Sequence, residues 1–184
     1  VGFIFGRKLY KELQMPVGLI QSTWGGTHAE SWTERRVMKD NPLYADVMEE
    51  FAPQNVKREK DKCKVPATLW NGMIAPIKGY TIKGNIWYQG ESNSADPALY
   101  KKLFPAMVAQ WREFFHNPAM PVCYVQITPW QAEGKDRLDR AWFRQCQLEL
   151  MQEVPNVGMV TTTDAGSEKF IHPPYKIKGG QRLA

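Results

Sequence analysis

The chain has 184 residues, of which 43% are hydrophobic and 23% charged, and its formal net charge is +5. These values are typical of a globular domain with a sizeable core, and no apolar run approaches the length of a membrane-spanning helix. Basic and acidic residues are interspersed over residues 49–62. The positive excess therefore predicts a solvated surface rather than a nucleic-acid-binding stripe, and neither nucleic acid nor membrane is expected as a partner.

Three cysteines, Cys63, Cys123 and Cys146, are widely spaced in the sequence. None belongs to a CxxC pair or has a histidine nearby, which argues against a zinc site. Cys123 lies in an apolar run and is predicted to be a small core residue. Because the number of cysteines is odd, they cannot all be paired in disulfides within the chain. One disulfide between two of them is left as an alternative.

The first third of the chain predicts a helix, a strand and a charged surface segment. Apolar residues recur at helical spacing from Phe3 to Leu13, so a helix is expected over residues 3–14 and Pro16 should end it. Residues 17–20 are predicted to form a short buried strand, which a glycine-rich polar turn follows at residues 21–27. Residues 43–66 favour a surface helix and a loop.

The rest of the chain alternates strands and helices. Strands are expected at 86–88, 122–127 and 157–163, and helices at about 97–115 and 138–153. Asp96 and Pro97 are typical of a helix start, and Pro105 should kink that helix or mark a restart. Residues 131–136 are expected to be a polar loop. This alternation predicts an α/β fold, a three-layer α/β/α sandwich with a mainly parallel sheet, as one domain over residues 1–184.

Polar clusters follow three of these segments. They are the turn at residues 22–26, the turn at residues 89–93, and His172 with Asp164 upstream. Parallel strands bring their carboxyl ends to one rim, so the three clusters are expected to meet there. Glycine-turn amides with a carboxamide can stabilise an oxyanion, and a histidine held by a carboxylate can act as a general base. These are the parts of an acyl-transfer site.

Three sequence blocks resemble the sialate O-acetylesterase family of SGNH hydrolases. They are PVGLIQSTWGGT at residues 16–27, IWYQGESN at 86–93 and IHPP at 171–174. The resemblance implies hydrolysis of acetyl esters on sugars by a serine nucleophile, without metal or cofactor, and an acetylated carbohydrate as the partner. It also suggests a periplasmic or secreted protein.

The resemblance implies that His172 is the general base. The family commonly has an acid just before this histidine, whereas this chain has Phe170 there. The acid that orients the imidazole is therefore open among Glu91, Asp164 and Glu168. Glu91 is favoured because related acetylesterases use the glutamate of this turn, although a purely structural carboxylate is the alternative.

Gly25, Gly26 and Gln89 are the candidate oxyanion-hole residues. The alternatives are a tight turn that needs positive φ at the glycines and, for Gln89, a buried amide that satisfies loop backbone. Trp24 and Asn93 are candidate substrate-binding residues, with buried packing as the commoner role of a tryptophan.

The nucleophile is expected to lie outside this chain. The family places its serine in a GQSN-type motif upstream of the position of Val1, and no such motif occurs here. Ser22 and Ser92 lack the glycine surround of a nucleophile elbow. The chain is thus predicted to be an N-terminally truncated fragment, inactive by itself. An acetylxylan-type esterase and a non-catalytic carbohydrate-binding relative remain the alternative functions, and the sequence predicts no oligomeric state.

Overall fold

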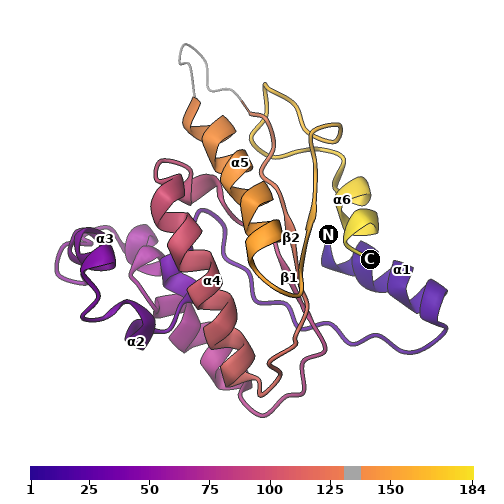
Figure 1. The fold of residues 1–184 in the computed structure, drawn as a ribbon, viewed down its shortest axis with the longest axis horizontal. Helices are drawn as coiled ribbons and strands as arrows, with labels where there is room; N and C mark the ends of the chain where they lie inside the picture. The colour runs from indigo at the N-terminus through magenta and orange to yellow at the C-terminus, as the bar shows by residue number, and fades with distance from the viewer. Residues whose placement is uncertain (131–137) are drawn as a thin grey trace. The chain divides into compact units, whose positions relative to one another are not determined.

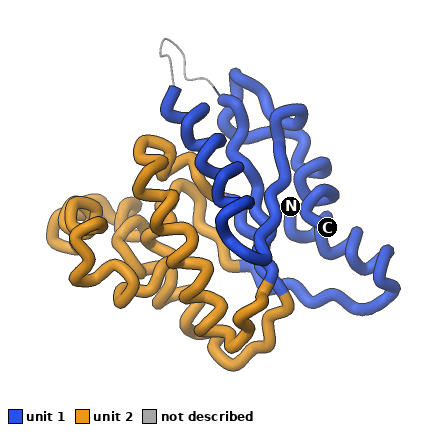
Figure 2. Tube along the Cα trace, in the orientation of Figure 1, with its two compact units in different colours: residues 1–21, 84–88, 121–184 blue, residues 22–83, 89–120 orange. Residues whose placement is uncertain are grey.

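The computed structural model describes residues 1–130 and 138–184. Their trace divides into two compact units, shown in Figure 2. Unit 1 comprises residues 1–21, 84–88 and 121–184, and unit 2 comprises residues 22–83 and 89–120. The single domain stays a prediction, and the polar loop predicted at 131–136 lies outside the described residues.

Unit 1 is built on a parallel sheet in the order β1-β2-β3, formed by Asn85–Trp87, Val122–Val125 and Val157–Val160. Ile86 is in register with Cys123, which is in register with Gly158. The α/β class with a parallel sheet is confirmed, and the three strands begin within a residue of their predicted positions.

Helices cover both sides of this sheet (Figure 1). Helix α5 (Leu138–Glu153) packs on β3, while α6 (Lys176–Leu183) contacts β2 and β3 and lies beside α1 (Gly2–Leu13). The two helices approach closely because Gly180 has no side chain: a Cβ there would lie 2.8 Å from Cβ of Ile4. Unit 1 therefore has the three layers expected of an α/β/α fold.

A buried glutamine joins α5 to the end of β2. Gln147 is fully buried, and its side-chain oxygen accepts a hydrogen bond of 2.9 Å from the Ile127 N–H. Its amide nitrogen donates to the Val125 carbonyl at 3.4 Å. The Gln147 side chain thus supplies hydrogen bonds to backbone groups at the carboxyl end of β2, where pairing with the neighbouring strands ends.

The buried strand predicted at residues 17–20 is wrong. The segment forms no strand, and Leu19 and Ile20 are 48% and 49% exposed. Leu19 instead packs against α1 at Gly6. Glycine has no Cβ, and a Cβ built there would lie only 2.9 Å from the Leu19 Cδ1. A four-residue apolar run is ambiguous because a strand also needs a paired neighbour, which the pattern does not specify.

Unit 2 contains one long helix and several short segments. The long helix is α4 (Pro97–Phe114), and the short ones are η1 (Ala29–Trp32), α2 (Arg35–Met38), η2 (Pro42–Tyr44), α3 (Ala45–Glu50), η3 (Glu59–Lys64), η4 (Trp70–Ile74), η5 (Ala75–Ile77) and η6 (Glu91–Asn93), where η marks a 3-10 or π turn. Asp96 caps α4 as predicted, by accepting a 2.9 Å hydrogen bond from the Leu99 N–H.

The α4 helix runs through Pro105, so of the two predicted outcomes, a kink or a restart, the restart is wrong and the kink stays a prediction. Leu103, Phe104 and Met107 on either side of the proline are at most 3% exposed. Burial of such side chains is worth roughly 1.5–3 kcal/mol each, which together exceeds the roughly 3 kcal/mol cost of a proline within a helix. Packing therefore overrides the local propensity.

Aromatic rings form much of the unit 2 core. Trp70 packs edge-on against Phe114 with ring centres 4.7 Å apart. Trp111 is buried, and its indole N–H donates to the Trp32 carbonyl at 3.1 Å. This bond ties α4 to η1, the segment that follows the glycine-rich turn. Among the described helices, none is both long and apolar enough to cross a membrane.

Substitution of a buried aromatic residue of α5 should destabilise unit 1. Phe143 is fully buried, so Phe143→Ala should lower the unfolding free energy by roughly 3–5 kcal/mol through lost burial and a residual cavity. The matched control is Phe170→Ala, because that ring is 62% exposed. Urea denaturation followed by circular dichroism compares the two, and equal losses would contradict the described packing.

Candidate active site

The glycine-rich turn of unit 2 is held in shape by Thr27. Its hydroxyl donates to the Trp24 carbonyl at 2.9 Å and accepts from the Trp32 indole N–H at 3.0 Å. Gly26 has φ of 71°, a conformation that side chains disfavour, and nothing lies within 4 Å of a Cβ built at Gly25 or Gly26. Of the two glycines for which positive φ was foreseen, Gly26 therefore has it and Gly25 does not.

Both glycines present unpaired backbone donors. Within the described part of the chain, the N–H groups of Gly25 and Gly26 form no hydrogen bond, and both residues are exposed. Trp24 beside them is 57% exposed, so its ring is open to solvent rather than packed in the core. Adjacent N–H groups on exposed residues can receive an anion, and an exposed indole can stack on a sugar ring.

Asn93 connects this turn with the second polar turn. Its side-chain oxygen accepts from the Ala29 N–H at 2.9 Å and from the Gln89 amide at 2.6 Å, while its own amide donates to Glu30 at 2.9 Å. The residue is only 8% exposed. Every polar group of the Asn93 side chain is therefore engaged inside the protein.

Gln89 bridges the two turns directly. Its amide nitrogen also donates to the Thr27 carbonyl at 3.1 Å, so both amide hydrogens are used. Its side-chain oxygen is buried and has no partner among the described residues. Rotation of the amide would put this oxygen against two acceptors, from Thr27 and Asn93, and the network therefore selects one amide orientation.

Glu30 is the residue of this network that sequence reasoning missed. Its carboxylate is 2% exposed, and burial raises its pKa, while the Asn93 hydrogen bond and the Glu30 backbone N–H lower it. Burial, with the charge of Glu30 as a second cause, also raises the pKa of Tyr44. The only signal in the sequence is a carboxylate between Ala29 and Trp32, directly after a polar turn.

Glu91 begins the η6 turn and is half-buried. Its carbonyl accepts from the Ser94 hydroxyl at 2.9 Å, which closes the turn. Gln89, Glu91 and Asn93 thus come from one short segment, which the Asn93 network holds to the Gly25–Gly26 turn within unit 2.

The remaining two predicted catalytic residues lie in unit 1. His172 is exposed, in the segment that leads into α6. Asp164 accepts two hydrogen bonds from Arg182, at 2.6 and 2.7 Å, and one from Lys178 at 3.2 Å. The Arg182 and then the Lys178 hydrogen bonds hold the pKa of Asp164 well below its usual range. Both carboxylate oxygens are therefore engaged by α6.

The structure brings the predicted residues together in two groups. Gly25, Gly26, Gln89, Glu91 and Asn93 are joined within unit 2, whereas His172 and Asp164 belong to unit 1. That the two groups form one site stays a prediction. The described residues contain no cluster of three or more side chains able to hold a metal ion, and the cysteines are free.

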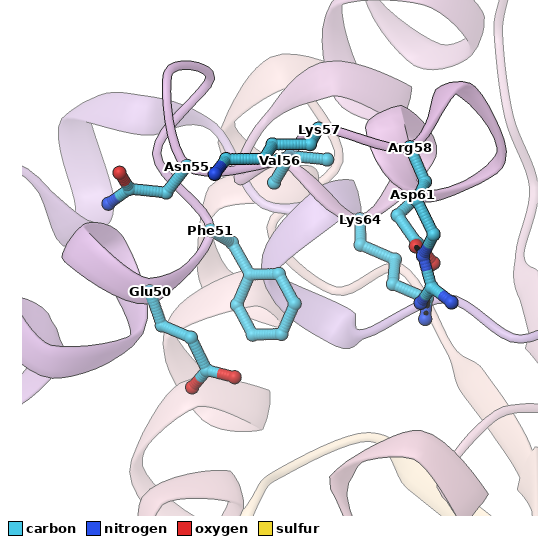
Figure 3. Close-up of a pocket in the computed structure, with 8 residues that line it drawn as sticks. All are labelled: Glu50, Phe51, Asn55, Val56, Lys57, Arg58, Asp61 and Lys64. Atoms are coloured by element: carbon cyan, nitrogen blue, oxygen red, sulfur yellow. Dashed lines mark hydrogen bonds and ion pairs between the residues drawn. The ribbon is translucent and has the colours of Figure 1, made fainter.

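A hollow of about 420 Å³ in unit 2 is lined by residues from the stretch 50–64 (Figure 3). None of the predicted site residues lines it. Its Phe51 ring lies 4.8 Å from the ring of His28, centre to centre. Asp61 in its wall pairs with Arg58 at 2.5 Å and Lys64 at 2.9 Å, so both cations share a single carboxylate.

Known structures with this fold include a carbohydrate acetylesterase. A carbohydrate acetylesterase from Xanthomonas citri superposes on 100% of the chain with a TM-score of 0.82 and 31% identity, over 38% of its own length. An Arabidopsis thaliana protein shares the fold with a TM-score of 0.61 over 98% of the chain and 64% of its own, at 19% identity. The architecture is therefore an α/β fold of the carbohydrate acetylesterase kind.

The family model described as "Carbohydrate esterase, sialic acid-specific acetylesterase" matches residues 1–184. The chain belongs to this family. Sialate O-acetylesterase of Mus musculus is 32% identical over 190 residues, covering 88% of the chain, and that of Homo sapiens is 42% identical over 121 residues, covering 64%. The chain spans 35% of the mouse protein and 21% of the human one.

The two adjacent glycines should respond differently to the same substitution. Gly26→Ala forces a Cβ into a left-handed conformation and should cost about 1–2 kcal/mol of stability. Gly25→Ala is the matched control, because φ of Gly25 is not positive and its Cβ also meets open space. Thermal unfolding of both variants measures the difference, and equal effects would refute the turn conformation.

The Asp164–Arg182 pair should make stability depend on pH on the acid side. Because the folded pKa of Asp164 is lowered, the pair contributes stability above about pH 4 and loses it as pH falls further. Asp164→Asn should therefore lower the melting temperature at pH 7, and this difference should shrink below about pH 4. Arg182→Gln should show the same trend. A difference that stays constant from pH 7 to pH 3 would contradict the pairing.

Proposed function

We propose that the protein containing this chain is a serine esterase that removes O-acetyl groups from sialic acid or a related acetylated sugar. The main support for this proposal is the Gly25–Gly26 turn, which exposes two unpaired N–H groups. Hydrogen bonds of Thr27 and Gln89 hold the turn in place. Membership of a carbohydrate esterase family and the acetylesterases among the relatives support this chemistry. No cofactor is assigned a role.

The oxyanion of the tetrahedral intermediate is held, in this proposal, by the Gly25 and Gly26 N–H groups and by the Gln89 amide. Gln89 contributes by exchanging its 3.1 Å bond to the Thr27 carbonyl for one to the substrate oxygen. The shorter 2.6 Å bond to Asn93 keeps the amide in place during this exchange. Such donors act mainly on the transition state.

His172 is proposed as the general base, with a serine outside these 184 residues as the nucleophile. The serine oxygen bonds to the acetyl carbon while its proton passes to His172. The sugar oxygen then leaves with that proton. A water molecule, deprotonated by His172, bonds to the acetyl carbon, and the serine oxygen leaves as acetic acid is released, taking back the proton from His172. Glu91 is the preferred acid for orienting the imidazole, because both oxygens of Asp164 are engaged by α6.

The exposed Trp24 favours a second candidate, a carbohydrate-binding relative without catalysis. An acetylxylan-type esterase differs only in its substrate. Asn93, which was predicted to contact substrate, is instead proposed to act through its hydrogen bonds, because its side chain is buried and both its oxygen and its nitrogen are hydrogen-bonded.

Acetate release by the full-length protein tests the proposal. O-acetylated sialic acid and acetylated xylan are supplied separately, and acetate is measured enzymatically. His172→Asn should lower kcat roughly 10²–10⁴-fold, since it removes the base. His116→Asn is the matched control, because His116 is exposed at the end of α4 and has positive φ, which asparagine tolerates.

The orienting acid is identified in the same assay. Glu91→Gln should lower kcat far more than it changes KM, whereas Asp164→Asn should chiefly affect stability. The reverse result would assign the role to Asp164. Sugar binding without acetate release would favour the binding candidate, and release by the 184-residue chain alone would show that a nucleophile lies within it.

A further inference from the structure

Glu30 is the one side chain of the unit 2 network that accepts hydrogen bonds but cannot donate them when ionised. It is 2% exposed, and none of the roles proposed above uses it. A buried carboxylate is costly unless it is paired or hydrogen-bonded, so its presence here calls for a physical reason. Its one partner through a side chain in the described network is the Asn93 amide, at 2.9 Å.

This carboxylate, together with the Ala29 N–H, determines the orientation of the Asn93 side-chain amide. An asparagine amide presents a donor on one side and an acceptor on the other. Because Glu30 only accepts, the Asn93 NH₂ must face it, and the Asn93 oxygen must face the Ala29 N–H and the Gln89 amide. The orientation of Asn93 therefore follows from two groups together, the Glu30 carboxylate on one side and the Ala29 N–H on the other.

The same constraint passes on to Gln89. With the Asn93 oxygen facing it at 2.6 Å, Gln89 must present its NH₂ there, and the second hydrogen of that NH₂ then lies toward the Thr27 carbonyl at 3.1 Å. This second hydrogen is the one that the proposed function assigns to the oxyanion. Donors and acceptors thus alternate from Glu30 through Asn93 to Gln89.

We propose that Glu30 is a positioning residue for catalysis, which aims the Gln89 amide at the developing oxyanion through Asn93. The inference rests on the proposed function for the role of Gln89. It differs from a purely structural role because it predicts a change in kcat that depends on Gln89, beyond any change in stability.

A charge swap tests the relay. Glu30→Gln leaves an NH₂ facing either Asn93 or the Glu30 backbone N–H, so one hydrogen bond is lost in either orientation. Asn93→Asp places two carboxylates in contact. In the double variant Glu30→Gln/Asn93→Asp, the amide introduced at position 30 donates to the carboxylate introduced at position 93, which still accepts from Ala29 and Gln89. All of the hydrogen bonds are thereby restored with one of them reversed.

In the full-length protein, Glu30→Gln should lower kcat about ten-fold with KM unchanged, the scale of one lost hydrogen bond. Asn93→Asp should lower kcat further, and the double variant should return to within about three-fold of wild type. Glu59→Gln is the matched control, because that carboxylate is 84% exposed and pairs only with Lys62 among the described residues. Melting temperatures are measured alongside.

The Gln89→Ala background separates failure of this inference from failure of the proposed function. Gln89→Ala alone should lower kcat about 10²-fold, and an unchanged rate would refute the oxyanion role itself. If that role holds, Glu30→Gln should add nothing in the Gln89→Ala background. A further drop there, or a double swap that restores the melting temperature but not kcat, would overturn the positioning role.

The relay also has a readout that needs no activity. In the full-length protein, the Gln89 side-chain NH₂ hydrogens should be protected from solvent exchange in NMR spectra, since both are hydrogen-bonded. Glu30→Gln should reduce this protection and the double swap should restore it. Unchanged protection in Glu30→Gln would refute the relay whether or not the protein is an esterase.

Discussion

The side-chain amide of Asn93 is the interaction on which the organisation of unit 2 depends. Through three hydrogen bonds it joins the segment that begins at Gln89 to Ala29 and Glu30, which follow the glycine-rich turn. Two turns more than sixty residues apart in the sequence are thereby held to each other. Because the amide is buried, loss of any one partner would leave a polar group without water to replace it.

A different kind of interaction, an ionic contact, holds the segment of unit 1 that contains His172. Asp164, at the start of this segment, is held by Arg182 and Lys178 of α6, which itself packs on β2 and β3. The pair is exposed to solvent, so it orders the segment without burying charge. Unit 2 thus relies on a buried neutral amide and unit 1 on an exposed ionic contact, and only the latter should weaken strongly in salt.

Regular elements with strong periodicity were predictable. The helix beginning at Asp96 and Pro97 and the parallel strands of unit 1 follow from local patterns, since caps and apolar runs act over a few residues. The exceptions were cases in which distant contacts outweigh the pattern. Residues 17–20 look like a buried strand yet Leu19 and Ile20 are half exposed, and Pro105 lies inside a continuous helix because its neighbours are buried.

The sequence by itself determined the fold class, the family resemblance and the residue types available for acyl transfer, because these depend on local pattern and on motifs. Only the tertiary structure decided how the polar groups pair. It turned Gln89 and Asn93 into a fixed network, assigned Asp164 to α6 and revealed Glu30, which no motif marks. The physical reason is that a hydrogen bond depends on which side chains are buried side by side, and that is settled by packing between segments far apart in the chain.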